Sequence, residues 1–243
     1  MAKKILFTSL KGGVGVTTCA LGLGLALSKV GEKTLIVDGD CLCASAVTIC
    51  GLNSSQFYTL ADYEKGACRA KQLLLNNSKE SNLYLLPTLG CGKESVLLSA
   101  LNEVEGLFDY VIADGCAADF CDSAVVITEP YTPSLKSADK CLSNLKDVGF
   151  KEVSLIINKY SGALATSGKI ISAQEIATLL RTPLTAVIPE DLFLAVGEVK
   201  KQTLSAFKMA ADNLRGKTKN TFNALKSYSG INGLIKRKMR EKI

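Results

Sequence analysis

The sequence predicts a doubly wound α/β fold, in which a mostly parallel sheet is covered by helices on both faces. Seven short apolar runs rich in β-branched residues alternate along the chain with longer segments that are compatible with helices. The runs are hydrophobic throughout, which is typical of strands buried on both faces. A chain of 243 residues with 47% hydrophobic residues can also bury one large core. We therefore expect one α/β domain followed by a tail.

The expected strands occupy residues 5–8, 34–37, 83–86, 110–113, 124–128, 154–157 and 185–188. The first helix pattern covers residues 17–29, and the last core helix is expected around 203–214. Because parallel strands are joined by right-handed crossovers, the connecting helices should fall on both faces of the sheet.

Composition excludes several classes of protein. The chain has no histidine, so imidazole cannot act as a general base, metal ligand or pH switch. Its nine cysteines are an odd number and form no CxxC pair, which argues against a disulfide framework or a zinc knuckle. The amino terminus runs directly into a strand pattern, and no stretch approaches the roughly 20 apolar residues of a spanning helix. We expect a cytoplasmic protein.

Charge is distributed unevenly along the chain. The net charge is +6, yet residues 215–243 hold nine Lys or Arg and one acidic residue, so the rest of the chain is slightly negative. This asymmetry predicts an acidic partner for the tail, either an anionic membrane surface or nucleic acid.

A glycine-rich segment follows the first expected strand and precedes a helix pattern. It consists of Lys11, Gly12, Gly13, Val14, Gly15, Val16, Thr17 and Thr18. Glycines permit positive φ angles and a close approach of the backbone, so successive N–H groups can converge on phosphate oxygens at the start of the helix. The segment predicts phosphate binding; the alternative is a glycine-rich turn without a ligand.

This segment resembles the phosphate loop of the MinD/ParA family of ATPases, whose deviant Walker A pattern is K-G-G-x-G-K-T/S-T. Seven of the eight positions match. The resemblance implies that Lys11 reaches the phosphates of a partner in an ATP-dependent homodimer and that the Thr17 hydroxyl binds Mg²⁺. Val16 stands where the family has its inner lysine. Loss of that contact, worth about 1.5–3 kcal/mol, predicts weak or absent ATPase activity. A natural loss and an engineered change are both compatible with Val16.

Acidic residues follow two of the expected strands. Asp38 and Asp40 resemble the first switch of the family, which implies that Asp38 lies near the metal and that Asp40 orients the attacking water. Asp114 ends a segment that resembles the Walker B strand and would hold Mg²⁺. A solvated turn is the alternative for the first pair. Two positions depart from the pattern, Ser45 where asparagine is frequent and Cys116 where proline is usual.

The base of ATP should be held by segments nearer the carboxyl terminus. Asn158 resembles the asparagine that contacts adenine in the family. Pro189, Glu190 and Asp191 resemble the segment that closes over the base. The resemblance thus implies ATP and Mg²⁺ as cofactors.

The chain ends in a basic amphipathic pattern. Its apolar face contains Ile231, Leu234, Ile235 and Met239, and basic residues such as Lys236 and Arg237 flank it. The pattern resembles the membrane-targeting helix of the MinD branch of the family. We expect a domain over 1–214, a polar linker over 215–230 and a membrane-targeting helix over 231–243. The alternative is an ordinary last helix packed on the domain.

The resemblance implies a spatial regulator of bacterial cell division that is associated with the inner face of the cell membrane. Its partners would be division-site regulators of the MinC and MinE type. DNA is a weaker candidate because the domain is slightly acidic. Two other functions remain open, an ATP-independent scaffold on the membrane and a dimer like the nitrogenase iron protein, which would share an iron–sulfur cluster through Cys91 and Cys121.

Overall fold

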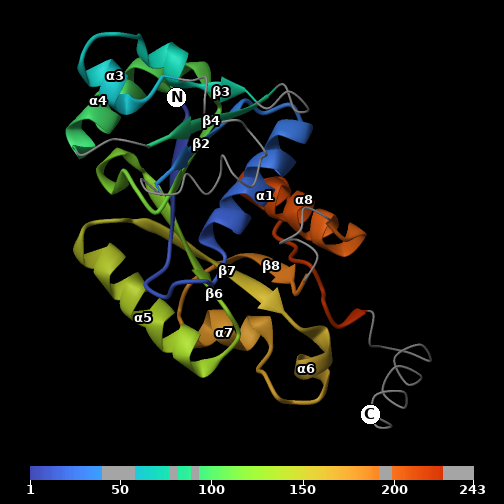
Figure 1. Cartoon of the computed structure of the whole chain (residues 1–243). Coiled ribbons are helices and arrows are strands. Elements are labelled where there is room, and N and C mark those ends of the chain that lie inside the picture. The colour runs from blue at the N-terminus through green and yellow to red at the C-terminus, as the bar shows by residue number, and fades with distance from the viewer. Residues whose placement is uncertain (40–57, 77–81, 89–92, 192–198, 227–243) are drawn as a thin grey trace.

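The computed structural model describes residues 1–39, 58–76, 82–88, 93–191 and 199–226, which form one α/β domain (Figure 1). Eight strands form a single sheet in the order β3-β4-β2-β5-β1-β6-β7-β8. Their bounds are Lys3–Thr8 (β1), Thr34–Asp38 (β2), Leu75–Asn76 (β3), Leu83–Pro87 (β4), Tyr110–Asp114 (β5), Ser123–Thr128 (β6), Glu152–Tyr160 (β7) and Leu184–Pro189 (β8). All pairings are parallel except that of β3 with β4. The predicted fold class is confirmed.

Each of the seven expected strands is present, extended by a few residues at one or both ends. The two-residue β3 is the strand that the sequence pattern did not predict, because it is too short to produce an apolar run. The long helices are α1 (Val16–Lys29), α4 (Glu94–Val104), α5 (Thr132–Asp147) and α8 (Lys201–Leu214). Shorter ones are α3 (Leu60–Glu64), α6 (Gly162–Thr166), α7 (Ala173–Leu179), and the 3-10 turns η2 (Ala70–Leu73), η3 (Glu105–Leu107) and η4 (Ala118–Phe120).

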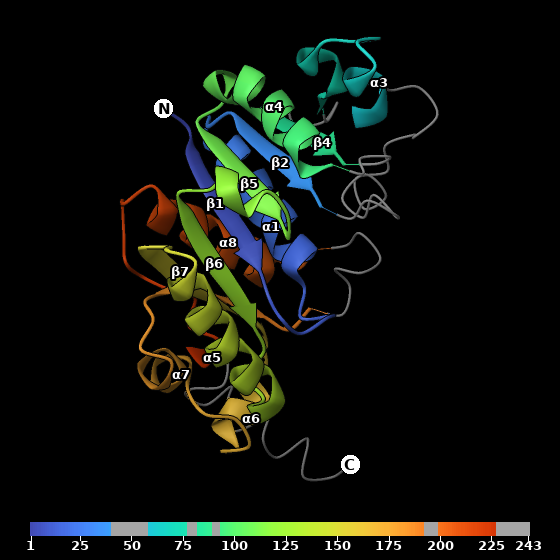
Figure 2. The ribbon, with the colours of Figure 1, turned by 90° about the vertical axis from the view of Figure 1, so that its left-hand side faces the viewer.

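The helices cover both faces of the sheet, as Figure 2 shows for α1 and α5. Successive strand residues point to opposite faces. In β1, therefore, Ile5 and Phe7 belong to the apolar cluster that contains residues of α1 and α8, whereas Leu6 belongs to the cluster on the other face, which contains residues of α4, α5 and α7. Both faces carry an apolar cluster, which explains why the strands are hydrophobic throughout their length.

The chain continues along the domain after α8. Arg215 forms an ion pair with Glu32 at 2.7 Å, and Asn213 Nδ2 donates to the carbonyl of Asn220 at 2.9 Å. Phe222 packs against both apolar clusters and Ala224 is buried. The expected linker thus contacts the domain at several points between residues 215 and 224, while residues 216–220 are exposed. The expected tail helix, with Ile231, Leu234, Ile235, Lys236, Arg237 and Met239, lies outside the described residues.

In the part of the chain that the structure describes, we find no helix whose length and hydrophobicity would let it cross a membrane.

Candidate phosphate-binding site

The glycine-rich loop lies between the carboxyl end of β1 and the first turn of α1. Gly13 and Gly15 have φ angles of 75° and 93°, in the left-handed region that favours glycine. A Cβ atom at Gly15 would lie 2.4 Å from Asn158 Nδ2, so a larger residue would displace that side chain. No side chain caps the start of α1, and its first turn holds no acidic residue. The first amides of the helix are thus suited to an anion.

Two adjacent residues of β7 hold the loop by hydrogen bonds to its backbone carbonyls. Asn158 Nδ2 donates to the carbonyl of Val14 at 2.8 Å. The Lys159 ammonium donates to the carbonyl of Gly13 at 2.6 Å. The side chain that the sequence assigned to adenine is therefore in contact with the loop backbone, and its contact with a base stays a prediction.

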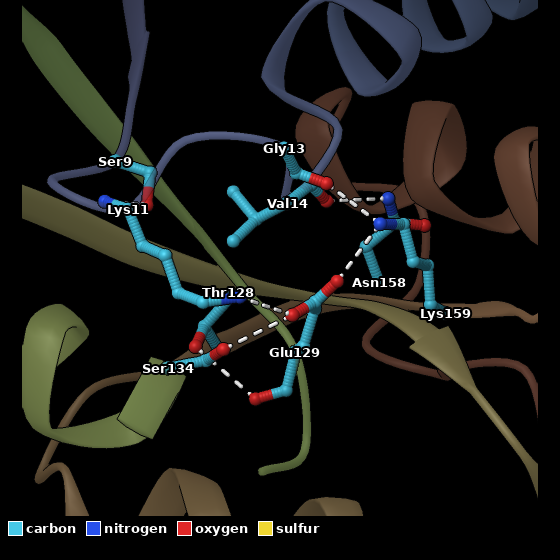
Figure 3. A network of polar contacts seen from close by, with 9 residues as sticks. All are labelled: Ser9, Lys11, Gly13, Val14, Thr128, Glu129, Ser134, Asn158 and Lys159. Carbon is cyan, nitrogen blue, oxygen red and sulfur yellow. Dashed lines mark hydrogen bonds and ion pairs between the residues drawn. The ribbon is translucent and has the colours of Figure 1, made fainter. Parts of the chain in front are cut away.

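A buried carboxylate joins the loop to the rest of the site. Figure 3 shows Glu129, just after β6, between two lysines. Lys11 Nζ lies 2.8 Å from Glu129 Oε2, and Lys159 Nζ lies 2.8 Å from Oε1. Ser134, in the first turn of α5, donates to Oε2 at 3.1 Å. Burial raises the pKa of Glu129, but the hydrogen bonds from Lys11, Lys159 and Ser134 outweigh it and hold the pKa below its usual value.

Sequence reasoning missed Glu129, Lys159 and Ser134. The positions of Glu129 and Lys159, each at the carboxyl end of an expected strand, were the available signal, since ligand sites of parallel sheets lie at that edge. Lys11, in contrast, was expected to reach a partner. In this structure its ammonium is bound within its own chain.

Val16, Thr17 and Thr18 form the start of α1. Val16 is partly buried and packs against the apolar cluster under α1. Thr17 and Thr18 are also partly buried, and the helix ladder begins with Cys19 N donating to Gly15 O at 2.9 Å. Position 16 therefore contributes apolar packing and no charge to the phosphate loop.

Two of the three predicted metal ligands, Asp38 and Asp114, lie side by side at the sheet edge. Asp38 and Asp114 are register partners at the ends of β2 and β5, and both are buried. Gly39 N donates to the carbonyl of Asp114 at 3.1 Å, and Cys116 packs against Gly39. Carboxylate and hydroxyl oxygens are the ligands that Mg²⁺ prefers, and it often takes only one or two carboxylates beside phosphate oxygens. Asp40 and Ser45 lie outside the described residues.

The predicted base-closing segment has a structural role at α8. The Asp191 carboxylate accepts hydrogen bonds from Lys200 N at 2.9 Å and from Thr203 Oγ1 at 2.7 Å, which fixes the start of that helix. Glu190 N donates to Tyr160 O at 3.2 Å, and Pro189 pairs with the same residue in the sheet. The ends of β7 and β8 are thus held together next to the phosphate loop.

The placement of Cys121 gives no support to an iron–sulfur site. The adjacent Asp122 N donates to Lys4 O, at the amino end of β1, whereas the phosphate loop follows its carboxyl end. Burial raises the pKa of the Cys121 thiol to about 12. Cys91 lies outside the described residues, within which no group of three or more Cys, Asp or Glu could hold a metal.

A parallel sheet with a glycine-rich loop between β1 and α1 and an aspartate at the end of a neighbouring strand defines the class of P-loop nucleotide-binding proteins. Residues 2–90 match a family model described as an AAA domain. The putative septum site-determining protein MinD of Guillardia theta is 31% identical over 264 residues, covering 99% of this chain and 97% of that protein. MinD of Thermotoga maritima is 30% identical, covering 80% and 79%. The chain belongs to the MinD family.

Solved structures agree with this assignment. MinD of Aquifex aeolicus superposes with a TM-score of 0.79 at 25% identity, covering 89% of this chain and 98% of that one. The MinC:MinD complex from Aquifex aeolicus gives a TM-score of 0.80 at 25% identity, covering 89% and 97%. MinD of Pyrococcus horikoshii, complexed with Mg-ADP, has the same fold, with a TM-score of 0.74 at 23% identity and coverage of 88% and 96%.

Proposed function

We propose that this chain is a regulator of division-site placement that binds Mg-ATP and uses it to control its residence on a membrane. The observation that carries the proposal is the phosphate loop itself. Its positive-φ glycines and uncapped helix start favour an anion, in a chain that is 31% identical over nearly its whole length to a septum site-determining protein.

The residues present fit a nucleotide bound with Mg²⁺. The amides of the loop from Gly12 to Gly15 and those of Thr17 and Thr18 would hold the phosphates. The Thr17 hydroxyl and the carboxylates of Asp38 and Asp114 would face the metal ion. When bound, Mg²⁺ would neutralise part of the charge on the phosphates.

This chain would hydrolyse ATP slowly. Val16 is partly buried against the apolar cluster and offers no cation to the β- and γ-phosphates, so nucleotide binding is weakened by roughly tenfold to a hundredfold relative to a lysine. Asp40 would still orient the attacking water. Val16 also favours a second candidate, a membrane scaffold in which nucleotide no longer changes the state of the protein.

Membrane attachment would come from residues 231–243 on the inner face of the cell membrane. Leucine and isoleucine would enter the boundary of the acyl chains, and each lysine or arginine near anionic lipid adds about 1 kcal/mol. One such tail binds weakly. Two tails on an ATP-dependent homodimer bind far better because the second attachment is intramolecular. The contacts of Arg215, Phe222 and Ala224 with the domain support this arrangement, since they hold the segment that precedes the tail.

The partners that this assignment suggests are proteins. The Aquifex aeolicus relative was solved as a MinC:MinD complex, which supports a MinC-type partner here. A MinE-type regulator would be the second. The slightly acidic domain argues against DNA.

Titration of the full chain with Mg-ATP, followed by flotation with anionic liposomes, tests the proposal. We expect saturable ATP binding and ATP-dependent flotation that is lost in Ile235→Glu. Thr218→Glu, in the expected linker, is the charge-matched control and should float. Flotation that is equal with and without ATP, together with absent ATP binding, would contradict the nucleotide switch and favour the scaffold.

A further inference from the structure

The carboxyl end of β7 has an irregularity directly below the phosphate loop. Ile157 pairs with Val187 and Tyr160 pairs with Pro189, so β7 has one more residue than β8 between these two pairs. Within this bulge Lys159 has a φ angle of 53°, which is uncommon for a residue other than glycine. Such a conformation is costly unless its surroundings hold it.

The bulge directs two consecutive side chains at two consecutive carbonyls of the loop. Lys159 binds the carbonyl of Gly13 and Asn158 binds that of Val14. In a planar trans peptide the C=O and the following N–H point in opposite directions. The N–H groups of Val14 and Gly15 are therefore turned away from β7. A cation on the Gly13 carbonyl also polarises that amide and strengthens its N–H as a donor.

Glu129 fixes the Lys159 ammonium in this position. The two lysines bind different oxygens of the carboxylate, Lys159 on Oε1 and Lys11 on Oε2. Lys159 therefore keeps its acceptor when Lys11 leaves for another anion. Two ammonium groups and one buried carboxylate leave one positive charge under the loop, in a chain whose position 16 provides none.

We propose that Lys159 is a positioning residue for the phosphate chain of a nucleoside diphosphate or triphosphate. It acts through the Gly13 carbonyl, holding the loop amides in their binding orientation and supplying charge that the loop lacks at Val16. The inference rests on the proposed nucleotide binding and names Lys159, on β7, as a residue that supports it. It predicts that loss of the Lys159 ammonium lowers the affinity for nucleotides that carry phosphates and leaves the affinity for adenosine unchanged.

The test is calorimetric titration of the full chain with Mg-ADP and with adenosine. Lys159→Met should weaken Mg-ADP binding about tenfold and leave adenosine affinity unchanged, whereas Lys159→Arg, which keeps the charge, should recover most of the loss. Val16→Lys should reduce the effect of Lys159→Met to about threefold or less, since it returns a cation to the loop. The control is Lys151→Met, an exposed lysine just before β7.

Equal losses for Mg-ADP and adenosine would overturn the inference, because they would place Lys159 at the base or in the fold. So would a Lys159→Met protein that binds Mg-ADP like the wild type. If the wild-type protein does not bind Mg-ADP, the proposed function is wrong and the inference about Lys159 is wrong as well. Should Lys159→Met not fold, the amide signals of Val14 and Gly15 in the wild-type protein serve instead: addition of ADP should shift both, and unchanged signals would refute the inference.

Discussion

The Lys11 ammonium lies 2.8 Å from Glu129 Oε2 of the same chain. The family resemblance directs this lysine at the phosphates of a partner subunit, so in this structure it is held within its own subunit. For Lys11 to reach a partner it must leave a buried carboxylate. Ser134 and Lys159 continue to satisfy that carboxylate after Lys11 has left, which lowers the cost of the exchange.

Replacing Lys11 by alanine should abolish ATP-dependent dimerisation and leave the affinity of the monomer for ATP within a few fold. The reason is that Lys11 contacts Glu129 and no loop carbonyl in this structure, whereas Lys159 holds the loop itself. Light scattering after size exclusion, with and without Mg-ATP, measures the first effect. Lys140→Ala, an exposed position on α5, is the control. Dimers of the Lys11→Ala protein at wild-type ATP concentrations would contradict this role.

The lowered pKa of Glu129 predicts a pH-dependent stability. A carboxyl group whose pKa is lower in the folded state stabilises the fold above its unfolded pKa, near 4.5, and this contribution is lost as the pH falls through the folded pKa. Glu129→Gln should therefore lower the stability by about 1–3 kcal/mol at pH 7 and by less at pH values below 4.5. Denaturant unfolding at a series of pH values gives the difference. A difference that is constant between pH 7 and pH 3.5 would show that the charge is not responsible.

Gly15→Ala should destabilise the protein by about 2–4 kcal/mol and abolish phosphate binding. The new Cβ would require a left-handed backbone that costs about 1–2 kcal/mol, and it would displace Asn158 from Val14. Gly106→Ala is the matched control, because nothing lies within 4 Å of a Cβ at that position. Thermal unfolding compares the two variants, and equal melting temperatures would contradict the packing of Asn158 against the loop.

Val16→Lys should raise the affinity for Mg-ATP by roughly tenfold to a hundredfold and increase the hydrolysis rate. Val16 lies in the first turn of α1, where it is partly buried against the apolar cluster. A lysine side chain at this position would have to turn away from that cluster to extend along the loop. Val16→Met, which is long and uncharged, separates length from charge. An equal gain in the Met and Lys variants would refute the electrostatic explanation.

The sequence predicted the fold because its information is local. Continuous apolar runs mark strands buried on both faces, and each of the seven expected runs became a strand. The contacts that hold the phosphate loop are not local. Glu129 meets Lys11 across 118 residues, and Lys159 meets Gly13 across 146. These pairings depend on strand order and on a bulge at the end of β7, neither of which leaves a periodic signal in the chain.

Asp191 shows a second reason why the sequence did not predict the whole site. The resemblance assigned it to the base, and the structure uses its carboxylate to fix the start of α8 through Lys200 and Thr203. A motif shared with a family predicts where a residue lies. It does not predict which of its polar atoms already form hydrogen bonds within the chain. The terminal helix over 231–243 lies outside the described residues, and both the helix and its role on a membrane stay predictions.

Calorimetric titration of the wild-type chain and of Gly15→Ala with Mg-ADP measures whether this loop binds nucleotide phosphates without the inner lysine. We predict saturable binding of one Mg-ADP per chain for the wild type and no detectable binding for Gly15→Ala. Absence of binding to the wild type at millimolar Mg-ADP, or equal binding by both proteins, would contradict this prediction.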